Sequence, residues 1–167
     1  DITSVLSNTI IAAAFGGLAA LLSTWAYLGI ANINHLFRGL LGGLVAITAS
    51  ADVVSVQSAM MIGILGGGIV PLASALMDRL KLDDVVGVVS VHGVAGMVGI
   101  VTLPFFIEPD SLVILNQTLE QPLSTVSFFL VQAFGAIICL FWSYVVGLLM
   151  WKMFDMITIF NLRPEEE

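Results

Sequence analysis

Long runs of apolar residues constrain this chain more than any other feature of its sequence. Hydrophobic residues fill 59% of the 167 positions and charged residues only 10%, against about 25% charged in a soluble domain. A membrane-spanning helix needs about 20 mostly apolar residues. Five runs reach or approach that length: Val5–Leu28, Gly39–Ala51, Val53–Met77, Val85–Ile107 and Val126–Trp151. We predict an all-α membrane protein, one transmembrane domain over residues 1–167, built as a bundle of about five transmembrane helices in the lipid bilayer.

The basic residues sort to one side of such a bundle. They are Arg38, Arg79, Lys81, Lys152 and Arg163. With five alternating spans they fall in the first connection, the third connection and the C-terminal tail. The opposite side carries Asp1, Asp52, Glu108, Asp110 and Glu120. Because Lys and Arg concentrate in cytoplasmic loops, we predict a protein of the cell (plasma) membrane with its N-terminus outside and its C-terminus in the cytoplasm.

Glycines recur inside the runs at three- and four-residue spacing, as in Gly39 with Gly43 and Gly63 with Gly67. Small residues at this spacing share one helix face and let two backbones approach closely, so we expect tight helix packing. The second run is short for a span. It is either a short helix packed among others or a re-entrant segment, because non-helical backbone is tolerated at depth only inside protein.

Composition also excludes several functions. A net charge of −7 argues against nucleic acid as a partner, since that would need a basic stripe. Cys139 is the only cysteine, so the chain cannot build a disulfide framework or a zinc site, and we expect Cys139 to be a small buried apolar residue. The sequence offers no nucleophile–base set and no metal-binding cluster. We predict no enzyme, no metal and no cofactor.

The segment from Lys81 to Gly93, which reads KLDDVVGVVSVHG, carries most of the polar chemistry. Asp83 and Asp84 stand where the fourth helix is predicted to begin, and acids there stabilise free N–H groups and the positive end of the helix dipole. His92 lies eight residues beyond Asp84, roughly 12 Å along a helix. In a hydrocarbon core about 30 Å thick, that depth is close to the midplane.

A histidine at that depth is costly and favours a functional role. Val88 and Asp84 precede His92 at four-residue spacing on the same helix face. A neutral imidazole is expected there, and it offers one donor and one acceptor. It can pass a proton or bind a small neutral polar molecule. The alternative is a histidine that only packs helices. His35, next to Arg38 in a polar connection, is expected to be solvated.

Three stretches of the sequence resemble the ammonium transporter family, Amt/MEP/Rh. The stretch from Lys81 to His92-Gly93 and on to Gly99 is similar to the family's penultimate helix. Residues 39–49, GLLGGLVAITA, resemble the family's GxLAGLVAITA segment, and Asn8-Thr9 leads into an alanine-rich helix of the family type. The tail, Leu162-Arg163 with Glu165–Glu167, is also similar to the family's. The spacing favours the Amt branch.

The resemblance implies part of an eleven-helix fold made of two inverted repeats and a last helix, assembled as a homotrimer with one pore per subunit. It implies that His92 is one of two touching pore histidines, that Val88 lines the pore, and that Asp83 and Asp84 stabilise the helix start. It also implies a PII-type regulator as a candidate partner. The first-repeat helices are missing from the chain, and Arg38 stands where the family has a small or amide residue.

Three functions are compatible with these observations. The leading interpretation is transport of ammonium or ammonia through an apolar pore with a midplane histidine. The second is an ammonium-sensing membrane domain. The third is a structural half that must assemble with a partner chain carrying the missing first-repeat helices.

Overall fold

The computed structural model describes residues 2–119, 122 and 124–157. Its elements are α1 (Ile2–Leu28), α2 (Ile33–Ile47), α3 (Val56–Arg79), η1 (Val88–Ala95), α4 (Gly96–Phe106), α5 (Pro109–Thr118) and α6 (Thr125–Ile157). Among the described residues, α1, α3, the continuous η1–α4 segment and α6 are long and apolar enough to cross a membrane, and α2 is a shorter apolar helix. The prediction of an all-α bundle of membrane type is confirmed. The predictions on Arg163 and Glu165–Glu167 lie outside the described residues.

The chain divides into two compact units, residues 1–133 and 134–167. The first contains α1 to α5 and the beginning of α6. In the second, the described part of α6 is an apolar helix with nearly all its side chains exposed. Cys139 lies on that helix and is exposed. The prediction that it is buried is wrong, because a lone helix offers no core within its own unit.

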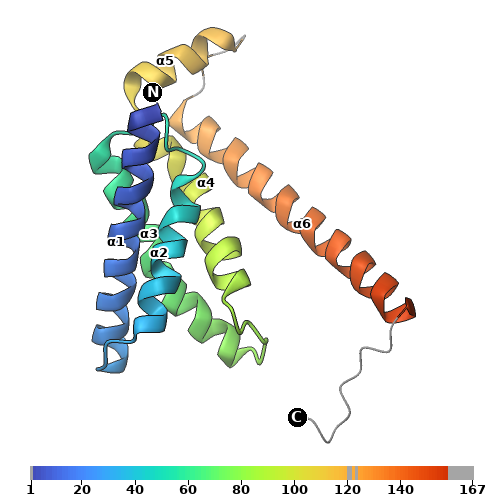
Figure 1. Ribbon diagram of the computed structural model, residues 1–167. Helices are drawn as coiled ribbons and strands as arrows, with labels where there is room; N and C mark the ends of the chain where they lie inside the picture. The colour runs from blue at the N-terminus through green and yellow to red at the C-terminus, as the bar shows by residue number, and fades with distance from the viewer. Residues whose placement is uncertain (1, 120–121, 123, 158–167) are drawn as a thin grey trace, which may run out of the picture. The chain divides into compact units, whose positions relative to one another are not determined.

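Helices α1, α2 and α3 pack side by side as the centre of the first unit (Figure 1). Small residues set how closely they approach. A Cβ added to Gly16 of α1 would lie 2.7 Å from the Gly39 carbonyl oxygen and 2.8 Å from the Gly43 Cα of α2. Gly67 of α3 also lies against the backbone of Gly16. The tight packing predicted from the glycine spacing is confirmed.

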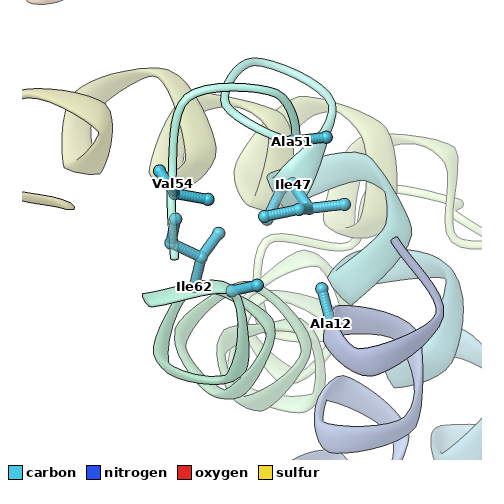
Figure 2. Close-up of a cluster of buried hydrophobic side chains, with 7 residues drawn as sticks. Ala12, Ile47, Ala51, Val54 and Ile62 are labelled. Atoms are coloured by element: carbon cyan, nitrogen blue, oxygen red, sulfur yellow. The ribbon is translucent and has the colours of Figure 1, made fainter. Parts of the chain in front are cut away.

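An apolar cluster closes the end of this unit where α1 begins. It comprises Ala12, Ala46, Ile47, Ala51, Val54, Ala59 and Ile62, five of which are labelled in Figure 2. The buried Asn8 side chain ties the α2–α3 loop to α1, because its Nδ2 donates to the carbonyl oxygens of Ala51 at 3.0 Å and Val54 at 2.9 Å. Val54 also forms an isolated antiparallel bridge with Ile107 at the end of α4.

Helix boundaries differ from the predicted ones where capping residues decide them. Helix α2 begins at Ile33, six residues before the apolar run, because the Asn32 side chain accepts a hydrogen bond from the Asn34 amide at 2.9 Å. This Asn cap satisfies an amide that the helix itself cannot. A further helix, α5, occupies the predicted polar loop and begins at Pro109, a residue suited to a first helical turn.

Candidate functional site

The segment that contains His92 is a π-helix. It spans Val88–Ala95 and continues directly into α4. Such helices, with hydrogen bonds between residues i and i+5, are rare in proteins. Where they occur, they are often at functional sites. The helix begins at Val88 rather than at Val85, because Gly87 before it has φ of 76° and ends the preceding turn in a left-handed conformation. Only the last four of the eight steps from Asp84 to His92 are helical. The depth estimate made from an α-helix starting at Asp84 therefore does not hold.

Asp84 fixes the start of η1 from three residues before its N-cap. One carboxylate oxygen accepts the Val89 amide at 3.0 Å. The other accepts the Ser90 amide at 3.0 Å and the Ser90 hydroxyl at 2.9 Å. The Val89 and Ser90 amides are among those that a helix start leaves without partners. Partial burial of Asp84 acts to raise its pKa, but the hydrogen bonds from Ser90, Val89 and Val88 outweigh it, and the pKa lies below its ordinary value.

The two acids predicted at the helix start differ in what they do. Asp84 makes the contacts above, whereas Asp83 is exposed and points to no amide of η1 that the structure records. The side chains of Ser90 and Val91 are buried against the rest of the unit, with 0% and 1% of their surface exposed. Val88 and His92 are exposed on the same helix, Val88 by 55%. The helix therefore packs with one face and presents Val88 and His92 on another.

Arg38 of α2 reaches the turn that precedes η1. Its Nη2 donates to the Val85 carbonyl oxygen, and its Nη1 lies 3.5 Å from the Ser74 hydroxyl of α3. A Cβ placed on Gly87 would lie 3.4 Å from both Cδ and Nε of Arg38. From the sequence, Arg38 counted only toward the basic side of the bundle and as a departure from a family pattern. Arg38 lies just before the apolar part of α2 and 47 positions from Val85, so the sequence gave no sign of this contact.

His35 was predicted to be solvated, but the structure places it partly inside the unit. It lies in the first turns of α2, is half-buried, and its Nδ1 is buried without a hydrogen-bond partner among the described residues. It lines a cavity of about 140 Å³ between α1, α2 and α3, together with Ser23, Thr24, Tyr27, Pro71, Leu72, Ala75 and Asp78. The earlier start of α2 explains the difference, because it places His35 on a helix packed against α1 and α3.

Comparison with known proteins gives the family. The model of the Ammonium Transporter Family matches residues 2–167. The chain belongs to the ammonium transporter family. Ammonium transporter Amt2 of Archaeoglobus fulgidus is 33% identical over 172 residues, which cover 99% of this chain and 36% of that protein. Ammonium transporter Amt2 of Methanocaldococcus jannaschii is 32% identical over 163 residues, covering 98% of this chain and 35% of that protein.

Solved structures of family members have the same fold over the matched region. A sensor Amt protein superposes with a TM-score of 0.86 at 33% identity, covering 99% of this chain and 40% of that one. Mep2 of Candida albicans superposes with a TM-score of 0.82 at 29% identity, covering 99% of this chain and 37% of that one. The chain thus spans about a third of the length of the curated relatives it matches (33% and 36% for the first two).

Membership in the family confirms the resemblance drawn from the sequence, and the superposed structures confirm that the chain has part of the family's fold. Two of these relatives are named as ammonium transporters and one solved structure as a sensor Amt protein, and none of these names is that of an enzyme. This agrees with the prediction that the chain is not an enzyme.

Proposed function

We propose that the chain forms part of a protein that transports ammonium or ammonia across a membrane, and that Val88 and His92 line its conduction path. The proposal is supported by membership in the ammonium transporter family and by relatives named as ammonium transporters. Those relatives are about three times as long as the matched region, so the rest of the path comes from segments outside this chain.

The observation that carries the proposal is the two-faced packing of η1. The face with Ser90, Val91 and Ala95 is buried, and Val88 and His92 stand on an exposed part of the same helix. Ionisable side chains in membrane helices face the bundle interior or a water-filled pathway, because exposure to lipid is costly. His92 therefore needs a protein wall or a water-filled path beside it.

The chemistry of the two residues suits ammonia better than ammonium. Removing the hydration shell of a cation costs far more than that of a neutral molecule, and an apolar wall such as Val88 returns none of it. A neutral imidazole accepts or donates one hydrogen bond at each nitrogen. We infer that ammonia passes along this wall and that its proton moves separately, with His92 as a relay or hydrogen-bonding group.

The assembly we propose is a homotrimer in the cell membrane, with the C-terminus in the cytoplasm and a PII-type protein as a candidate regulator. The orientation rests on the charge pattern. Arg79 donates to the Tyr27 hydroxyl at 3.3 Å, and Arg38 binds Val85, so these basic residues gather at the end of the first unit where α1 and α3 finish. Asp52 and Glu108 flank the opposite end, where Asn8 and Val54 lie. Cytoplasmic loops are the ones enriched in Lys and Arg.

The first prediction tests His92 in the protein as the cell makes it. His92→Leu keeps apolar bulk and removes titration, and His92→Glu keeps a titrating group with a different charge. If His92 lines the path, both variants should assemble at wild-type yield. Their ammonium-dependent currents should differ from the wild type and from each other, because a single proton-transfer group typically contributes about 10²–10⁴-fold to a rate.

His35→Leu is the matched control, since His35 lies in the cavity between α1, α2 and α3 instead of on the face of Val88. We expect its current to stay near wild type. If instead His92→Leu conducts normally and His92→Glu fails to assemble, His92 only packs helices and the proposal is wrong. Binding of ammonium without any flux in the wild type would favour the alternative of a sensing domain. Flux that appears only after addition of a separate first-repeat chain would favour the structural half.

A further inference from the structure

Arg38 is placed where three segments of the first unit meet. It belongs to α2, its Nη1 lies 3.5 Å from the Ser74 hydroxyl on α3, and its Nη2 donates to the Val85 carbonyl in the turn before η1. Ser74 is buried, with 6% of its surface exposed. A guanidinium is a planar group with five donors in a fixed fork, so one Arg side chain can bind two acceptors on different segments at once.

The turn that Arg38 binds is shaped mostly by bonds within itself. The Gly87 amide donates to the Asp84 carbonyl oxygen at 2.9 Å, and the Asp84 carboxylate binds the amides of Val89 and Ser90. These bonds join residue 84 to residues 87–90, so they fix the local shape of the turn. They do not fix where the turn lies against α2 and α3. The Val85 carbonyl bond to Arg38 is the hydrogen bond that does so among those recorded for this turn.

Gly87 gives the turn its path next to Arg38. Its φ of 76° lies in the left-handed region that glycine adopts without strain. An added Cβ would lie at van der Waals distance, 3.4 Å, from the Cδ and Nε atoms of Arg38, so the left-handed backbone and not the space beside Arg38 favours glycine. The glycine that ends the turn and the arginine that holds it therefore fit together directly before Val88.

We propose that Arg38 is a positioning residue for the conduction path. Its guanidinium ties the turn before η1 to α2 and α3, and so sets where Val88 and His92 stand. This inference rests on the proposed function, because it assigns Arg38 a role through those two residues. The competing explanation is a charged side chain that extends to the membrane surface from a helix end, for which only the charge matters.

The test compares Arg38→Ala and Arg38→Lys with Arg79→Ala in the protein as the cell makes it. Arg79 is the matched control, since it lies at the same end and donates to the Tyr27 hydroxyl instead of to the turn. Lysine keeps the charge but cannot bind two acceptors in the fixed geometry of a guanidinium. Two quantities are measured: hydrogen–deuterium exchange of residues 85–91, and ammonium-dependent current against concentration.

We expect Arg38→Ala to raise amide exchange over residues 85–91 by about tenfold, the effect of losing one hydrogen bond from a charged donor. Its maximal current should fall while the concentration for half-maximal current changes little. Arg38→Lys should fall between Arg38→Ala and wild type in both measurements, and Arg79→Ala should match wild type in both.

The exchange measurement is independent of transport, so it separates this inference from the proposed function. Faster exchange in Arg38→Ala together with a wild-type current overturns the positioning role. Unchanged exchange overturns the tie itself, and full recovery of both quantities by Arg38→Lys shows that only charge matters, which also overturns it. If Arg38→Ala does not assemble, Arg38→Lys is compared with its control Arg79→Lys in the same two measurements. Exchange and current equal to those of the control would then overturn the inference. A His92→Leu variant with wild-type current, by contrast, counts against the proposed function and leaves the exchange result for the Arg38 tie unchanged.

Discussion

At the scale of single residues, Asp84 decides where the fourth apolar run becomes helical. Its carboxylate accepts hydrogen bonds from the amides of Val89 and Ser90, and the left-handed Gly87 lies between Asp84 and these residues. An acid next to a helix start is predictable from sequence, since carboxylates favour the positive end of the helix dipole. That Asp84 does this while Asp83 does not depends on the path of the turn, which the sequence of two adjacent acids cannot reveal.

The pKa of Asp84 gives a prediction for the dependence of stability on pH. Its pKa in the folded protein lies below the ordinary value of 3.8 because bonds from Ser90, Val89 and Val88 outweigh partial burial. The unfolded chain therefore binds the proton more readily, and the stabilisation is complete above the ordinary value and lost as pH falls through the folded one. We expect Asp84→Asn to lower the unfolding temperature by roughly 2–4 °C at pH 7, for a cap contribution of about 1 kcal/mol.

The same comparison in acid supplies the check on that prediction. As the pH falls below the ordinary value of 3.8, the unfolded chain binds the proton before the folded carboxylate does. The difference in unfolding temperature between wild type and Asp84→Asn should therefore shrink. Asp83→Asn is the control, because Asp83 is exposed and adjacent in sequence. It should change the unfolding temperature little at either pH. A difference between wild type and Asp84→Asn that is the same at pH 7 and pH 3.5 would contradict the assigned role of the carboxylate.

At the scale of helices, the close approach of α1, α2 and α3 depends on which side of a helix each glycine occupies. Gly67 and Gly68 are neighbours on α3. A Cβ on Gly67 would come inside van der Waals contact with three backbone atoms of Gly16, whereas one on Gly68 would meet only the Ala19 Cβ, at 3.6 Å. Backbone atoms cannot move aside without separating the helices, so the two positions should respond differently to the same substitution.

We therefore predict that Gly67→Ala lowers the free energy of unfolding by about 1–3 kcal/mol, the usual cost of overpacking a filled interior. Gly68→Ala should be neutral or slightly stabilising, because alanine is favoured over glycine inside helices by roughly 1 kcal/mol. Unfolding in detergent, followed by circular dichroism at increasing denaturant, measures both. Equal stability of the two variants would show that α1 and α3 are farther apart than described.

The helices also show how far sequence reasoning reaches. Each of the five apolar runs corresponds to a helix of the structure, because the length and apolar content of a run are read directly from the residues. The π-helical character of Val88–Ala95 was not predicted, since residue spacing alone does not distinguish a π-helix from the α-helix that follows it. The roles of Arg38 and His35 were missed for another reason: both depend on contacts with segments more than 30 positions away, such as Val85 and Pro71.

At the scale of the whole molecule, hydrogen bonds join the loops that the charge pattern assigns to the same side of the membrane. Asn8 and the Val54–Ile107 bridge join three segments at one end of the first unit, and Arg38 and Arg79 join others at the opposite end. The loops that charge alone assigned to common sides are thus bonded to one another. Position along the chain and position in space agree for the described part of the first unit, which is the condition for using those charges to orient it in a membrane.

The last prediction concerns that orientation. We expect the loop at Asp83 to face the cytoplasm and the residues around Asp110 to face outside, because Arg38, Arg79 and Lys81 lie on the first side and Asp52, Glu108 and Asp110 on the second. Asp110 and Asp83 are both exposed. A single cysteine is placed at either position in a background where Cys139, the only native cysteine, is alanine.

A membrane-impermeant thiol reagent added to intact cells should label Asp110→Cys and leave Asp83→Cys unlabelled until the membrane is opened. Both positions lie outside the apolar helices that could cross the membrane, so neither cysteine should disturb packing. Labelling of Asp83→Cys in intact cells, with Asp110→Cys protected, would show that the orientation is the reverse of the predicted one. The side from which the Arg38 turn and the start of η1 are reached would then be the outer one, and the proposed path would run inward from Val88 to His92.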